Sequence, residues 1–295
     1  MIRAVFFILV AGNVLAGDEQ LLLSNHVVRD WNSSDHPAIS ERGKKALELG
    51  PNAWQHVQSQ NFVLHSTNRS IAIGTSQEAE FYLAKVREAL GVDRNDAGRK
   101  SHIFIFQHEE DWKTFAKNAA IDPWTGGFFD GLDLFYRRKS GLGIHHSNST
   151  LPHEIAHRAL YEKFPSGTLP LALNEGVAEY HARKLAFQYL RPRGYDVRVI
   201  SKRVPKEHYI PAQELLAMKK YPAGEEKVGA FYDLSERLVF FLMEKHEPSK
   251  FADLLKALAG RQEFSLALLK TFAGEYGSVD QFERAFAEHA ILETK

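Results

Sequence analysis

Two short clusters of polar residues constrain the fold of this chain more than any other feature of its sequence. His153 and His157 stand four residues apart, and Glu175 follows His157 eighteen positions later. Residues i and i+4 of an α-helix lie on one face, so both imidazoles can reach a single point. The sequence therefore predicts that residues 153–157 lie on a helix. A second segment, which carries Glu175, would lie beside that helix.

The connection between the two clusters predicts a turn followed by a second helix. Residues 164–170 contain two prolines, a glycine and a serine, which break helices. Residues 171–180 then place Leu173, Val177 and Tyr180 at helical spacing. Glu175 and Glu179 are one turn apart on this second helix.

The residue types in the two clusters are those of a catalytic zinc site. Such a site uses three protein ligands and keeps one position open for water, and His153, His157 and Glu175 supply the three. Glu154 directly follows the first histidine, where a metalloprotease keeps its general base. Glu179 can accept the outer N–H of a ligand histidine and fix its orientation. The alternative is a surface helix with two solvated histidines and a solvated acidic face.

The stretches HEIAH (153–157) and NEGVAEY (174–180) resemble the gluzincin metallopeptidases, a group that includes thermolysin and the aminopeptidase N-type enzymes. Within it, the peptidase MA-like bacterial proteins are the most similar. The resemblance implies one Zn²⁺ per chain, with Glu154 as general base and with Glu179 and Asn174 as outer partners of the ligands. It implies three zinc ligands: His153, His157 and Glu175. The resemblance is strong over 150–180, diffuse over 60–290 and absent before 50.

The family resemblance also predicts an oxyanion donor. In aminopeptidase-like members, a tyrosine just before a helix hydrogen-bonds the tetrahedral intermediate, and Tyr232 is the matching position. An oxyanion needs such a preorganised donor beside the metal. The alternative is a buried core tyrosine, which would also find a hydrogen-bond partner.

A glycine-rich segment before the zinc helix is a candidate edge strand for substrate binding. Gly126, Gly127, Phe128 and Phe129 match the place where similar gluzincins pair the substrate backbone with a strand. Glycine permits close approach of another chain, although a simple hairpin arm is an equal alternative. Aminopeptidases carry a glutamate on this edge for the substrate's amine, and none follows here. This departure favours an endopeptidase over a standard aminopeptidase.

The whole chain is expected to have an α+β fold, a thermolysin-like zincin. A small mixed β-sheet would form the N-terminal half, helices most of the C-terminal half, and the active-site helix would lie between them. Residues 61–66 and 102–106 predict strands, 78–90 a helix that ends at Gly91, and a further helix runs through Trp112 and Phe115. Residues 236–288 predict successive helices whose core candidates share helical spacing: Phe240, Leu242, Leu254, Leu255 and Phe286.

The expected boundaries are a signal peptide over 1–16, an N-terminal segment over 17–58 and a metallopeptidase domain over 59–295. In that domain, 59–146 would form the α/β sheet part and 147–295 the helical part. Trp31 and Trp54 are candidate packing points in the N-terminal segment. The signal peptide rests on Arg3 and an apolar run that is short for a membrane span.

Composition limits the partners and the compartment. The chain has no cysteine, which excludes disulfides and thiolate zinc ligands. Lys and Arg together number 37, and so do Asp and Glu together. The chain therefore has no excess of positive charge that would favour nucleic acid. The expected protein is exported to the periplasm or secreted, and has no stable membrane span after signal removal.

The sequence thus predicts a zinc metallopeptidase acting on peptide or protein substrates, with its oligomeric state open. Two alternatives stay open: a zinc hydrolase of cell-wall peptide amides, and a catalytically silent binding protein with the zincin fold. Three further histidines, His145, His146 and His181, are given no role, because none shares the i, i+4 pattern.

Overall fold

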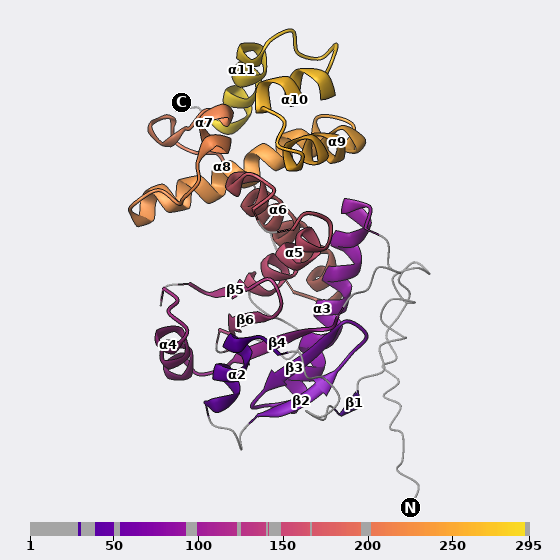
Figure 1. Cartoon of the computed structure of the whole chain (residues 1–295), viewed down its shortest axis with the longest axis vertical. Helices are drawn as coiled ribbons and strands as arrows, with labels where there is room; N and C mark the ends of the chain where they lie inside the picture. The colour runs from indigo at the N-terminus through magenta and orange to yellow at the C-terminus, as the bar shows by residue number, and fades with distance from the viewer. Residues whose placement is uncertain are drawn as a thin grey trace, which may run out of the picture.

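The computed structural model describes residues 29–30, 39–49, 54–92, 99–122, 125–139, 141, 149–165, 167–195 and 202–292. Residues 1–16, Trp31, His145 and His146 lie outside this part of the chain. A mixed β-sheet occupies the N-terminal half and helices fill most of the C-terminal half, as Figure 1 shows. This confirms the α+β class and the order of its two halves.

Six strands of the described chain form one sheet in the order β1-β2-β3-β4-β6-β5. The β3–β4 and β4–β6 pairs are parallel and the other pairs antiparallel. The bounds are β1 (Arg29–Asp30), β2 (Gln55–Gln58), β3 (Phe62–Ser66), β4 (Ser101–Phe106), β5 (Gly127–Phe129) and β6 (Leu134–Arg137). The two strands expected at 61–66 and 102–106 are confirmed as β3 and β4. Of the glycine-rich segment, Gly127–Phe129 form the edge strand β5 and Gly126 precedes it.

Ten α-helices and two 3-10 turns are present in the described residues. The helix bounds are α2 (Glu41–Glu48), α3 (Arg69–Leu90), α4 (Glu109–Asn118), α5 (Thr150–Lys163), α6 (Leu171–Leu190), α7 (Ala212–Ala217), α8 (Glu225–Glu244), α9 (Pro248–Ala259), α10 (Phe264–Thr271) and α11 (Val279–Ala290). The 3-10 turns are η3 (Arg191–Arg193) and η4 (Lys206–His208).

Helix α3 begins nine residues before the expected start at 78. Asn68 caps it, because its Oδ1 accepts the backbone N–H groups of Ser70 at 2.9 Å and Ile71 at 3.2 Å. The predicted end at Gly91 is confirmed, and this glycine has the left-handed φ of 61° common at helix C-termini. The additional turns bury small residues such as Gly74, so they carry little apolar periodicity.

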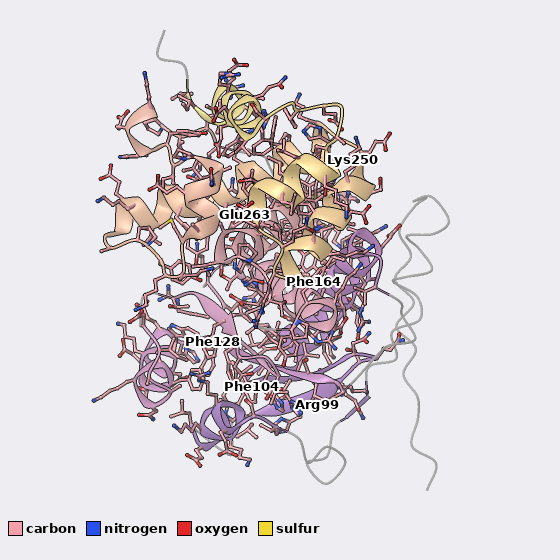
Figure 2. The ribbon with its side chains drawn as sticks, turned by 45° about the horizontal axis from the view of Figure 1, so that its top comes forward. Arg99, Phe104, Phe128, Phe164, Lys250 and Glu263 are labelled. Carbon is pink, nitrogen blue, oxygen red and sulfur yellow. The ribbon has the colours of Figure 1, made fainter. Side chains whose placement is uncertain are left out.

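The two faces of the sheet are covered by different helices. Helices α3 and α5 pack on one face and join the larger core, while α2 and α4 pack on the other face. That second core is aromatic: Phe104 and Phe128, both labelled in Figure 2, each stack on Phe135, at 4.9 and 4.8 Å between ring centroids. Trp54 meets Phe104 edge to face there, which confirms it as a packing point.

Helix α5 lies between the sheet and the C-terminal helices. It contacts β5 and β6 on the sheet side and packs extensively against α6, which in turn packs against α8 (Figure 1). The expected core positions after residue 236 are buried, with Phe240 only partly so. The chain therefore places its two polar clusters at the junction of its two halves.

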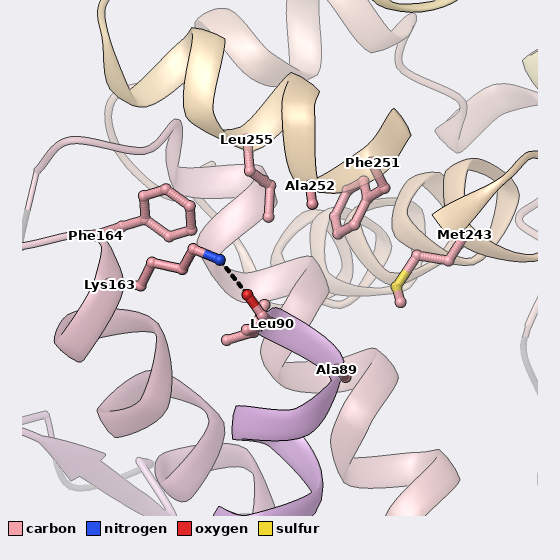
Figure 3. A pocket seen from close by; sticks show the side chains of 8 residues that line it. All are labelled: Ala89, Leu90, Lys163, Phe164, Met243, Phe251, Ala252 and Leu255. Carbon is pink, nitrogen blue, oxygen red and sulfur yellow. Dashed lines mark hydrogen bonds between the residues drawn. The ribbon is translucent and has the colours of Figure 1, made fainter. Parts of the chain in front are cut away.

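The seam between the ends of α3 and α5 and helix α9 is nearly closed. A cavity of about 10 Å³ remains there, lined by Leu90, Lys163, Phe164 and Phe251 among others (Figure 3). A space of this size holds at most one water molecule. The Lys163 ammonium donates to the carbonyl of Leu90 across the seam.

No helix of the described ranges is both long and apolar enough to cross a membrane.

Candidate metal centre

Helix α5 brings the two histidines of the first cluster together as predicted. The Nε2 atoms of His153 and His157 lie 2.9 Å apart, and their side chains are only 12 % and 13 % exposed. Pro152 stands in the first turn of α5, where a missing N–H costs no helical hydrogen bond. The two nitrogens face one another because i, i+4 positions share a face.

Helix α6 adds the third atom. Glu175 Oε2 lies 3.3 Å from His153 Nε2 and 3.5 Å from His157 Nε2. Close packing of α6 on α8 fixes this helix, because a Cβ on Gly176 would fall 2.2 Å from the carbonyl oxygen of Ser235. Among the described residues, His153, His157 and Glu175 are the group of ligands that could surround one ion.

The spacing of these atoms fits a small cation. A triangle with sides of 2.9, 3.3 and 3.5 Å has its centre about 1.9 Å from each corner. Zinc–nitrogen and zinc–oxygen bonds are about 2.0–2.2 Å, so an ion slightly above this plane satisfies all three. Two imidazoles and one carboxylate also match a common catalytic zinc donor set.

A second set of side chains surrounds the ligands. Glu179 Oε1 lies 3.1 Å from His153 Nδ1, a charge-pair distance at which the ring N–H is not well aligned for a hydrogen bond. Glu179 also pairs with Arg183 at 3.6 Å, and Arg183 reaches Asp233 Oδ1 on α8 at 3.0 Å. The predicted contact of Glu179 with a ligand histidine is thus present in space, and Arg183 anchors that carboxylate.

The ionisable groups of this cluster strongly shift one another's pKa values. Burial alone would lower the pKa of His153, but Glu175 and Glu179 raise it well above its usual value. Burial opposes ionisation of Glu175, yet the two histidines hold its pKa well below the usual range. Ionised carboxylates therefore stand around two imidazoles whose ring nitrogens face one another.

Glu154 belongs to the same electrostatic group. It is 5 % exposed, and burial raises its pKa, with His153 and His157 acting in the opposite direction. A carboxyl group that has a raised pKa and lies at a catalytic site often serves as the general base. The position directly after His153 therefore carries a carboxylate near the ligands, as the sequence predicts.

Tyr232 lies near the cluster, although the helix around it was misplaced in the sequence-based prediction. Its ring centroid is 6.3 Å from that of His153. It sits well inside α8, which begins at Glu225 rather than after residue 232. Gly224 and two acidic residues start α8 earlier, since Glu225 and Glu226 favour a helix N-terminus. Burial and Glu175 raise the pKa of Tyr232, which keeps its hydroxyl protonated at neutral pH.

Tyr221 is the residue that sequence reasoning missed. It lies in the loop between α7 and α8, and its hydroxyl donates to Glu175 Oε1 at 2.8 Å. Its ring stacks on Tyr232 at 5.8 Å with an interplanar angle of 22°. No local pattern signals this contact, because 46 residues separate Tyr221 from Glu175.

Asn174, a predicted outer partner, is not joined to the cluster, and neither is His181, to which the sequence assigned no role. Asn174 is half-buried in the first turn of α6, but its side chain forms no hydrogen bond with the described residues. His181 is buried, and burial lowers its pKa to about 3. It is not part of the ligand group of the described chain.

The glycine-rich segment lies at the edge of the described sheet, and packing inside the fold restricts one of its glycines. A Cβ on Gly127 would lie 2.5 Å from Thr150 Cγ2 and 2.7 Å from the Phe135 carbonyl oxygen. Packing of β5 against α5 and β6 therefore requires a glycine at this position, and pairing with a substrate stays a prediction. Gly126 is less crowded, with Thr150 Oγ1 at 3.1 Å.

A second group of histidines crosses the sheet. His56, His65 and His102, named here the imidazole row, stand on the neighbouring strands β2, β3 and β4. The Nδ1 atoms of His56 and His65 are 2.7 Å apart, and His65 Nε2 lies 2.8 Å from His102 Nδ1. Burial and the other two histidines lower the pKa of His65 well below its usual value.

Comparisons with known proteins add no family. No protein-family model matches this chain, and a search of curated proteins finds no match.

Proposed function

We propose that this protein is a zinc-dependent peptide hydrolase, more specifically an endopeptidase with a thermolysin-like arrangement. The observation that carries the proposal is the convergence of His153 Nε2, His157 Nε2 and Glu175 Oε2 within 3.5 Å of one another. This donor set suits one Zn²⁺ with an open position for water. Glu154 lies beside it as a buried carboxyl.

His153, His157 and Glu175 would hold the ion. When bound, zinc would supply Lewis acidity toward a water molecule and the scissile carbonyl. Glu154 takes the proton of the attacking water and later delivers it to the leaving amine. Tyr232 is a protonated hydroxyl near His153, and it would donate a hydrogen bond to the developing oxyanion.

Strand β5 would bind the substrate backbone. It is the end strand of the described sheet and it contacts α5, so its outer edge offers unpaired backbone groups beside the helix of the cluster. An extended peptide can add to such an edge through main-chain hydrogen bonds. Export of the protein stays a prediction, which rests on the sequence of residues 1–16.

The state of Asp130, the first carboxylate after this edge strand, supports an endopeptidase. Asp130 follows β5, but its Oδ1 accepts the N–H groups of Leu132 at 3.0 Å and Asp133 at 2.8 Å. These bonds close the turn to β6, so Asp130 is committed to the backbone. An aminopeptidase needs a carboxylate for the substrate's free amine, and Asp130 does not replace one.

The test is the Glu154→Gln variant, compared with wild type for zinc content and for cleavage of a diverse peptide library with and without chelator. We expect equal zinc content and a turnover lower by about 100-fold or more, because a general base contributes about that factor. Cleavage inside peptides, with blocked and free N-termini cut alike, identifies an endopeptidase. Full turnover in the variant contradicts the role of Glu154.

The same panel separates the alternatives. Cleavage of peptidoglycan cross-links without cleavage of the library identifies a cell-wall amide hydrolase. Zinc binding without any cleavage identifies a binding protein. Absence of zinc from protein supplied with it contradicts the metal site itself.

A further inference from the structure

The two carboxylate oxygens of Glu175 have different partners. Oε2 faces the histidine nitrogens at 3.3 and 3.5 Å, whereas Oε1 accepts the hydroxyl hydrogen of Tyr221 at 2.8 Å. A carboxylate ligand can bind an ion through one oxygen or through both. A hydrogen bond to a charged oxygen is among the stronger ones in proteins, and it competes with coordination by that oxygen.

The position of Tyr221 is defined on two sides even though it is 43 % exposed. Its ring stacks on Tyr232 and meets Phe231 edge to face at 5.6 Å, so two aromatic side chains of α8 hold the ring in place.

We infer that Tyr221 is a positioning residue that restricts Glu175 to binding the metal through Oε2 alone. This inference rests on the proposed metal site. By engaging Oε1, Tyr221 prevents that oxygen from taking a further position around the ion. The position left open is the one that a catalytic site reserves for water or substrate.

The inference is tested with Co²⁺ in place of Zn²⁺, in wild type and in Tyr221→Phe, by titration of the full-length metal-free protein. The visible bands of Co²⁺ are strong with four ligands and weaken as the number of ligands rises, so they report on geometry. Tyr209→Phe is the matched control, because its hydroxyl also donates to a carboxylate, Glu283, at 3.5 Å. Neither that tyrosine nor its partner belongs to the ligand group.

We expect weaker visible bands in Tyr221→Phe than in wild type, together with an apparent Co²⁺ affinity about 10-fold lower, as for outer partners of metal ligands. Tyr209→Phe should match wild type in both. Bands of unchanged intensity in Tyr221→Phe overturn the inference and leave the metal site standing. If wild type itself binds no Co²⁺ and no Zn²⁺, the metal site fails, and the inference fails with it.

Discussion

The proposed ligand group (His153, His157 and Glu175) and the imidazole row bring histidine nitrogens to similar distances, but their surroundings differ. In the cluster, His153 and His157 approach to 2.9 Å between carboxylates; in the row, His56 and His65 approach to 2.7 Å. Carboxylates raise the pKa of His153, whereas burial and neighbouring imidazoles lower that of His65. Proximity of imidazoles is therefore shared, and the neighbouring carboxylates distinguish the first group, for which we propose a bound cation.

The geometry of the two groups differs in the same direction. The rings of His153 and His157 meet at 81°, with both Nε2 atoms turned to one point that Glu175 completes. His65 and His102 instead stack within 7° of parallel, and the three rings are joined end to end across strands. A helix converges its side chains, while neighbouring strands arrange them in a row.

The largest expected effect comes from removing a ligand. His157→Ala should lower zinc affinity by more than about 100-fold, since even outer partners of metal ligands contribute about 10–100-fold. His56→Gln, the matched change in the imidazole row, should leave zinc affinity unchanged. Competition titration with a chromophoric chelator measures both. Equal losses in the two variants would remove the distinction between the groups.

A smaller effect is expected from Glu179, whose carboxylate lies beside His153. Glu179→Gln keeps the shape but removes the charge that faces His153 Nδ1 at 3.1 Å and Arg183 at 3.6 Å. Zinc affinity should fall by about 10-fold, the low end for outer partners. The same titration measures it, and an affinity equal to that of wild type would mean that Glu179 only pairs with Arg183.

The smallest expected effect is on the free energy of unfolding of the metal-free protein. The two groups of histidines should make it depend on pH in opposite directions. His65 has a lowered pKa when folded, so the unfolded chain binds more protons and stability falls as pH drops below about 6.5. His153 has a raised pKa when folded. The stability that His153 contributes is therefore fully present below pH 6.5, and it is lost as pH rises through the pKa of His153 in the folded protein.

Denaturant unfolding across pH, in the presence of chelator, compares wild type with His65→Phe and His153→Phe. As pH falls, wild type should lose stability relative to His65→Phe and gain it relative to His153→Phe. Slopes of the same sign in the two comparisons would show that the two groups of histidines do not differ in charge.

The sequence predicted the cluster well because its signal is local. The i, i+4 pattern of His153 and His157 and the break before α6 depend on nearby residues alone, and so does Gly91 at the end of α3. Strand β2 was missed because Val57 is its one buried residue, and pairing with β3 rather than apolar alternation makes it a strand. Tyr221 was missed because its contact with Glu175 joins distant segments.

The most direct test of the central claim is a crystal structure of the protein grown with Zn²⁺, with anomalous scattering measured at the zinc absorption edge. The account predicts one strong anomalous peak within about 2.0–2.2 Å of His153 Nε2, His157 Nε2 and Glu175 Oε2. Glu175 Oε1 should still accept a hydrogen bond from Tyr221. A peak at His56 and His65 instead, or no peak at the cluster, would contradict the account.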